Sequence, residues 1–165
     1  MDYEGAVMSS PTPLKPGDVL LYRPSSWVGW VIAIKTASKV ASHVEIAIRP
    51  GTSIAARQEG VDYYPTRWNK LSRVLRPNKP IDIPKGIEWF NANARGQKYD
   101  YLALGRFFCV GKQSTDRQIC SELATRFLRN SAVGWVPMGG EDADLISPRD
   151  FLKSDDFDVI WSDEG

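Results

Sequence analysis

The segment ASHVEIAIRPGTSIAAR, residues 41–57, predicts two short β-strands. In its first half Val44, Ile46 and Ile48 alternate with polar or small residues, as in a strand with one apolar face. A Pro-Gly turn follows, and the run after it is again short and apolar. We therefore expect a β-hairpin here.

His43 and Glu45 fall together on the other face of the predicted strand. His43 is the only histidine of the 165-residue chain. Neighbours on one strand face lie about 6 to 7 Å apart, so a glutamate can lean back to the imidazole and orient it. The alternative is a histidine with no catalytic duty.

Cys120 is predicted to begin a helix within STDRQICSELATRFLRN, residues 114–130. The apolar stripe of this helix comprises Cys120, Leu123, Ala124, Phe127 and Leu128. A thiol in a first helical turn has a lowered pKa, because the positive end of the helix dipole favours the thiolate. With an imidazole in reach, it would form the thiolate–imidazolium pair of cysteine hydrolases. The alternative is a cysteine that only packs in the core.

The composition is that of an ordinary globular domain. A net charge of +1 creates no strong field for nucleic acid or anionic membranes, so we expect neither partner. No run approaches the roughly 18 apolar residues of a spanning helix, and the N-terminus lacks the apolar core of a signal peptide. We expect cytoplasmic synthesis, a flexible leader over residues 1–12 and a single domain over 13–165.

The two cysteines are too few for a disulfide framework, and with one histidine they make no zinc site. We expect no metal and no cofactor. A Cys109–Cys120 disulfide is compatible with the sequence, but two free thiols are favoured. Cys109 has only apolar neighbours and is predicted to pack in the interior.

Further elements are predicted along the chain. We expect strands at 19–24 and 157–161, a helix starting at Ser25 or Ser26 with Trp27 and Trp30 on its stripe, and helices at 83–96 and 99–110. The tryptophans line either the core or a ligand site.

Residues 67–79 carry five positive charges and no negative one. This pattern indicates either a solvated rim or a lip that attracts an anionic substrate. The last 25 or so residues are acidic and predicted to be rich in loops.

Six motifs follow one another along residues 14–152. They are LKPGDVLLYR, TASKVASHVEIAI, GV, GQKYDY, ICSEL and SPRDF. In this order they resemble the circularly permuted branch of the NlpC/P60 papain-like superfamily. That branch includes the YiiX/YebB-type proteins and, more distantly, the lecithin:retinol acyltransferase-like enzymes. Here the histidine strand precedes the cysteine helix, as permutation requires.

The resemblance implies an α+β, papain-like fold, with the nucleophile helix packed against an antiparallel sheet. It implies that Cys120 is the nucleophile and His43 the base. Tyr99 matches a tyrosine beside the nucleophile, whose hydroxyl would help the Cys120 backbone N–H to stabilise an oxyanion. The alternative for Tyr99 is a packed aromatic side chain.

The third polar group departs from the pattern of many relatives, which supply it from the next strand. The matching position here is Ala55, which has no polar group. We expect Glu45 to take the role from the histidine's own strand, with Gln58 and Glu59 as weaker candidates.

The function implied by the resemblance is a cysteine peptidase that cleaves amide bonds in peptidoglycan stem peptides. A phage-encoded member would reach the cell wall in a virion or through a lysis system, and a virion protein would then be a partner. Two alternatives remain open: an acyl hydrolase or transferase acting on lipids or thioesters, and an inactive adaptor that keeps the fold.

Overall fold

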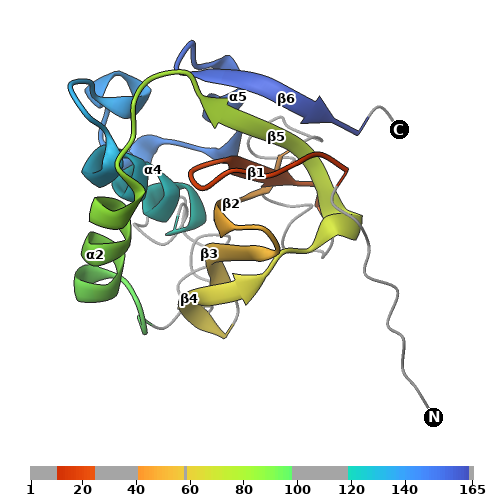
Figure 1. Cartoon of the computed structure of the whole chain (residues 1–165), viewed down its shortest axis with the longest axis horizontal. Coiled ribbons are helices and arrows are strands. Elements are labelled where there is room, and N and C mark those ends of the chain that lie inside the picture. Colours follow the sequence, from red (N-terminus) through yellow and green to blue (C-terminus); the bar gives the residue numbers. More distant parts are fainter. Residues whose placement is uncertain (1–10, 25–40, 58, 98–118, 164–165) are drawn as a thin grey trace, which may run out of the picture.

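The computed structural model describes residues 11–24, 41–57, 59–97 and 119–163. They form an α+β structure around one antiparallel sheet of six strands, in the order β4-β3-β2-β1-β5-β6 (Figure 1). The strands are β1 (Val19–Tyr22), β2 (His43–Arg49), β3 (Thr52–Arg57), β4 (Gly60–Pro65), β5 (Leu71–Pro77) and β6 (Phe157–Ser162). The α-helices of the described residues are α2 (Ile83–Asn93), α4 (Ile119–Ser131) and α5 (Pro148–Lys153), and short 3-10 turns are η1 (Trp68–Lys70), η3 (Pro137–Gly140) and η4 (Ala143–Leu145). The expected α+β class and antiparallel sheet are confirmed.

The predicted hairpin is β2 and β3, which pair antiparallel with Ile46 opposite Ile54. Gly51 in the turn has φ +79°, a left-handed conformation that glycine adopts without strain. The predicted strands near residues 19–24 and 157–161 are β1 and β6. The helices predicted at residues 25–34 and 99–110 lie outside the described residues, as does Cys109.

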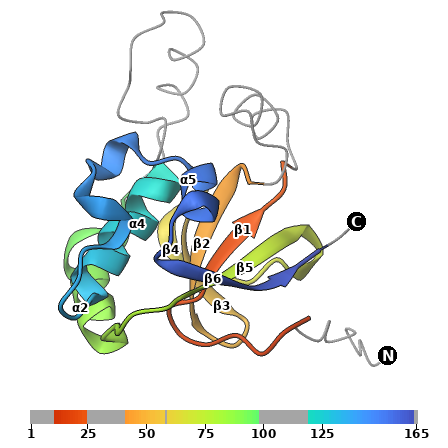
Figure 2. The same ribbon diagram turned by 90° about the horizontal axis from the view of Figure 1, so that it is seen from above.

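The sheet has two covered faces. The helix-side core includes Val44 and Ile46 of β2 together with residues of α2 and α4. A smaller core on the other face comprises Leu14, Leu20, Tyr22, Ala47, Leu71 and Val74, with Trp68, Ile160 and Trp161 packed against it. Figure 2 shows α2 and α4 together on one side of the strands. Val44 and Ile46 share one face of β2, as predicted, and this face is the one that the helices cover, whereas Ala47 packs in the core on the other side.

Helix α4 packs on β2, β3 and α2. Its approach to α2 depends on Gly86, where a Cβ atom would lie 1.9 Å from Ser131 Oγ and 2.8 Å from Phe127 Cζ. The second residue of α4 is Cys120, so this packing determines where the thiol lies. All four predicted stripe residues that follow Cys120 in α4 are buried.

The helix predicted at 83–96 is α2, which ends three residues earlier, at Asn93. The Asp82 carboxylate accepts a hydrogen bond from the Lys85 backbone N–H and caps its N-terminus. Pro84 lies in the first turn, where its missing N–H costs nothing. Gly96, with φ +86°, follows the helix at the predicted stop.

The basic segment 67–79 contains β5, and four of its cations make ion pairs or hydrogen bonds within the protein. Arg76 forms a two-bond pair with the buried Asp18 carboxylate at 2.8 and 2.7 Å. Lys79 pairs with Asp156, and Arg73 donates to backbone carbonyls. The segment therefore combines pairs to carboxylates from distant segments with cations that still reach the surface, since the Lys79 side chain is 46% exposed and the Arg67 side chain 34% exposed.

The acidic C-terminal region is more ordered than predicted. Helix α5 was not predicted, since it is only one and a half turns long and has little periodicity. Asp150 accepts hydrogen bonds from the backbone N–H and the hydroxyl of Ser147, at 2.8 and 2.7 Å, which stabilises the helix start. No helix in the described ranges has both the length and the apolar character needed to cross a membrane.

Candidate active site

The candidate site lies where the start of β2 meets the start of α4. His43 is the first residue of β2, and Cys120 is the second residue of α4. The thiol and the imidazole are hydrogen-bonded to each other. The Cys120 sulfur also accepts from the backbone N–H groups of Val44 and Ser121. Residues 77 positions apart in the sequence thus form one polar contact.

The second ring nitrogen of His43 is bound to Glu45. His43 Nε2 lies 3.0 Å from Glu45 Oε1. A nitrogen that faces a carboxylate carries the proton, so Nε2 is the donor. The nitrogen left for the Cys120 thiol is Nδ1. Cys120, His43 and Glu45 therefore form a continuous chain of hydrogen bonds.

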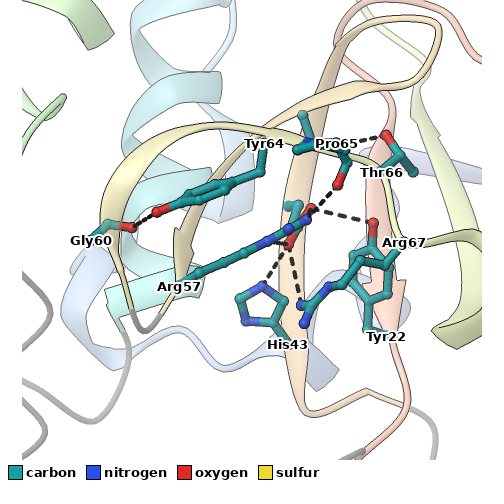
Figure 3. Close-up of polar contacts among 10 residues, drawn as sticks. Tyr22, His43, Arg57, Gly60, Tyr64, Pro65, Thr66 and Arg67 are labelled. Carbon is teal, nitrogen blue, oxygen red and sulfur yellow. Dashed lines mark hydrogen bonds and ion pairs between the residues drawn. The ribbon is translucent and has the colours of Figure 1, made fainter.

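The Glu45 carboxylate is completely buried, yet four side chains bind it. Arg57 donates from Nε to Oε1 at 2.8 Å and from Nη2 to Oε2 at 2.9 Å. The Tyr22 hydroxyl lies 3.3 Å from Oε2, and Arg67 Nη2 lies 3.4 Å from Oε1. Figure 3 shows His43, Arg57, Arg67 and Tyr22 converging from different sides, with the dashed lines meeting at one point. We call these four residues with Glu45 the Glu45 cluster.

Burial by itself would raise the pKa of Glu45, because a low dielectric disfavours the carboxylate. The hydrogen bonds from His43 and Arg57 outweigh burial and lower the pKa of Glu45 to about 2. The same surroundings raise the pKa of Tyr22 well above its ordinary value, through burial first and the adjacent Glu45 charge second. Glu45 is thus an anion, and Tyr22 a neutral hydroxyl, at every physiological pH.

The pKa values of His43 and Cys120 move in opposite directions. Burial lowers the pKa of His43, but the hydrogen bonds with Cys120 and Glu45 raise it further, to about 9. Burial raises the pKa of the Cys120 thiol, but the hydrogen bond from His43 and its charge outweigh burial, and the pKa is lowered. Both shifts favour a proton on the imidazole and a negative charge on the sulfur.

The sulfur has the position that a nucleophile needs. Cys120 lies in the first turn of a 13-residue helix, where the dipole stabilises an anion. Cys120 is a free thiol and only 9% exposed, while the His43 side chain remains 20% exposed. The arrangement can therefore hold a thiolate beside an acid that is in contact with solvent.

The other predicted site residues lie elsewhere. Tyr99 and Gln58 are outside the described residues. Glu59 is exposed in the turn between β3 and β4. Ala55 is buried in β3 and brings no polar group. Glu45 is the described candidate for the third position that meets His43.

Sequence reasoning missed Arg57, Arg67 and Tyr22. Arg57 lies two residues beyond the position where a third group was sought, so the next strand does supply a polar partner, but to Glu45 rather than to His43. The signal available was Arg57 itself, an arginine that follows Ile54, Ala55 and Ala56 on the strand next to Glu45. A charge so placed needs a partner, because unpaired buried charges are costly.

No group of three or more histidine, cysteine, aspartate or glutamate residues in the part of the chain that the structure describes is arranged to hold a metal ion. The sequence matches none of the family models and none of the curated proteins with which it was compared.

Proposed function

We propose that the protein is a cysteine hydrolase of the permuted NlpC/P60 type that cleaves amide bonds through an acyl-enzyme on Cys120. One observation carries the proposal: Cys120, His43 and Glu45 form a hydrogen-bonded chain in which the cysteine pKa is lowered and the histidine pKa is raised. Structural cysteines buried in apolar surroundings have raised pKa values instead.

In the acylation step the Cys120 thiolate adds to the carbonyl carbon of the amide, and the carbonyl oxygen takes the negative charge. The tetrahedral intermediate then collapses. As the C–N bond breaks, the imidazolium of His43 transfers its Nδ1 proton to the leaving nitrogen. The products of this step are a thioester on Cys120, a free amine and a neutral imidazole.

In the deacylation step the neutral His43 removes a proton from water, and the hydroxide adds to the thioester carbonyl. The C–S bond breaks and a carboxylic acid leaves. The Cys120 thiolate and the His43 imidazolium are restored. Glu45 keeps its charge throughout, since its pKa of about 2 is too low for it to accept the proton.

The substrate class comes from the resemblance. Six motifs in the permuted order support a peptidase for cell-wall stem peptides, and the six-stranded antiparallel sheet with α4 packed on it is compatible with a papain-like fold. We propose a phage-encoded wall hydrolase that acts from a virion or after cell lysis.

The first test is the pH dependence of Cys120 alkylation by iodoacetamide in the native protein, read by peptide mass spectrometry. Cys120 should react rapidly down to about two pH units below an ordinary thiol pKa of about 8.5. His43→Ala should abolish this reactivity at low pH. A Cys120 that titrates as an ordinary thiol, with or without His43, would contradict the enzyme class and favour an inactive adaptor.

The second test is digestion of purified peptidoglycan fragments, with Cys120→Ala as the control. New free amines in the wild-type digest, absent with the control, are the expected result. If the fragments stay intact while Cys120 is a reactive thiolate, the proposed cell-wall substrate is wrong, but the proposed class of cysteine hydrolase still stands. Thioester and phospholipid substrates would then test the acyl-transfer alternative.

A further inference from the structure

We infer that Arg57 is a positioning residue of this site: it holds the Glu45 carboxylate in the orientation that makes His43 present Nδ1 to Cys120. The inference rests on the proposed function, and it assigns to β3 a role that neither the triad nor the resemblance includes.

The contact between Arg57 and Glu45 has the geometry of a two-pronged clamp. Nε and Nη2 of one guanidinium bind the two carboxylate oxygens at 2.8 and 2.9 Å. Such parallel charge-assisted bonds fix the plane of the carboxylate as well as its distance. The Glu45 side chain is 0% exposed and the Arg57 side chain 12% exposed, so water competes little for either group.

Arg57 is itself held from two further directions. Its Nη2 also donates to the Pro65 carbonyl at 2.8 Å, and its guanidinium lies 4.6 Å from the centre of the Tyr64 ring. Both partners belong to β4, the edge strand beside β3. Figure 3 shows the Arg57 side chain extending from its strand past Tyr64 toward the Glu45 cluster. The clamp is thus anchored to two strands.

The sheet register explains why position 57 can do this. Projecting the antiparallel register from the Ile46–Ile54 pair brings position 55 opposite Glu45 and position 57 opposite His43. Opposite residues share a face, and diagonal neighbours are within reach of long side chains. Arg57 therefore reaches Glu45 diagonally on the face that also carries His43.

The other members of the Glu45 cluster cannot replace this clamp. Arg67 makes a single long contact of 3.4 Å, and its side chain is 34% exposed. The Tyr22 contact is also long, at 3.3 Å, and is neutral. Without Arg57, the carboxylate of Glu45 is free to turn about its side-chain torsions, and Oε1 no longer has to face His43 Nε2.

Arg57→Lys tests the geometry of the contact apart from its charge. Lysine keeps the positive charge, but its ammonium cannot make the bidentate contact of a guanidinium. We expect Arg57→Lys to move the acidic limb of the Cys120 alkylation profile upward by roughly one pH unit, because the imidazolium loses a well-placed hydrogen bond. The other groups that face Glu45 (His43, Arg67 and Tyr22) are unchanged in this variant, and position 57 keeps its positive charge, so the shift reports position.

Arg76→Lys is the matched control. Arg76 binds the buried Asp18 carboxylate through the same two atoms, at 2.8 and 2.7 Å, but in the β1–β5 part of the sheet. Both variants should lower the melting temperature, while Arg76→Lys should leave the alkylation profile of Cys120 unchanged. A profile that moves equally in both variants, or in neither, would show that Arg57 serves stability alone.

A second comparison remains informative if Arg57→Lys does not fold. Glu45→Gln and the double variant Glu45→Gln/Arg57→Met both lack the carboxylate, and the double variant also avoids an unpaired buried cation. If Arg57 acts through Glu45, losing Arg57 as well should move the acidic limb no further upward, because the carboxylate that it positions is already absent. A further upward shift in the double variant overturns the inference. If Cys120 of the wild type titrates as an ordinary thiol, the proposed function itself is wrong. This result differs from a wild-type thiolate that Arg57 does not influence, so failure of the function and failure of the inference can be told apart.

Discussion

His43 and Glu45 leave the same strand two positions apart, and their side chains meet through Nε2 and Oε1 at 3.0 Å. The backbone alone keeps neighbours on a strand face about 6 to 7 Å apart, so the glutamate has to lean toward the ring. The burial of Glu45 removes water as a competitor for both groups. Nε2 of His43 is therefore bound to Glu45, and Nδ1 remains available to Cys120.

Glu45→Gln should weaken the Cys120–His43 ion pair but keep the arrangement of the side chains in the site. The amide has the size of the carboxylate and can still accept from Nε2, but it no longer stabilises the imidazolium by charge. We expect alkylation of Cys120 at about pH 6 to slow by roughly tenfold, which corresponds to about one unit in the pKa. Peptide mass spectrometry after a timed iodoacetamide pulse measures this rate.

Asp62→Asn is the control for that experiment. Asp62, a residue of β4, forms a pair with Arg95 in which both side chains are about half exposed. Such pairs contribute little, so this variant should alkylate like the wild type. An unchanged rate in Glu45→Gln would mean that Glu45 does not act on the imidazolium.

The stability of the protein should fall in acid partly because of Glu45. Its pKa is lowered from 4.5 to about 2 in the folded state, so its contribution is present above about pH 4.5 and is lost as the pH falls toward about 2. The contribution is roughly 3 kcal/mol at about 1.4 kcal/mol per pKa unit. Urea unfolding at about pH 6, 4 and 3 measures the decline.

The variant Glu45→Gln/Arg57→Met isolates this contribution, because it carries no titrating group at position 45 and no unpaired cation at position 57. Its free energy of unfolding should decline less than that of the wild type between about pH 5 and pH 3. Parallel declines in the two proteins would assign acid sensitivity to other carboxylates, such as Asp156, whose pKa is also lowered although burial raises it.

Gly86→Ala should destabilise the protein by about 1 to 3 kcal/mol, the usual cost of overpacking. The new Cβ would lie 1.9 Å from Ser131 Oγ and 2.8 Å from Phe127 Cζ, so α2 and α4 have to separate. Thermal unfolding followed by circular dichroism gives the change. Glu88→Ala, an exposed position of the same helix, should be near neutral or slightly stabilising. Equal stability of Gly86→Ala and the wild type would contradict the close packing.

Asp156→Asn should cost about 1 to 3 kcal/mol. The carboxylate accepts from the backbone N–H of Met138 at 2.8 Å and from Lys79 at 2.6 Å. Met138 has φ +62°, an uncommon conformation for a side chain of its size, and the bond to Asp156 helps to hold it. Asp158→Asn, at an exposed residue of β6, is the control and should be near neutral in the same urea titration.

Local patterns were sufficient for several elements. The Pro-Gly turn and the alternation around it predicted β2 and β3, and Pro84 and Gly96 marked α2 because both residues restrict or permit specific backbone angles. The ion pairs of the basic segment were not predicted, because charge in a sequence does not reveal whether a carboxylate will face it. Asp18, which pairs with Arg76, lies 58 positions away.

The sequence by itself determined the separate parts of the candidate site. Strand periodicity put His43 and Glu45 on one face, and helical periodicity put Cys120 at the start of α4, since both patterns depend only on backbone geometry. The tertiary structure decided that the thiol meets the imidazole and that Arg57 clamps Glu45. These contacts depend on the sheet register and on the packing of α4, which arise from burial summed over the whole chain and are not encoded in any short segment.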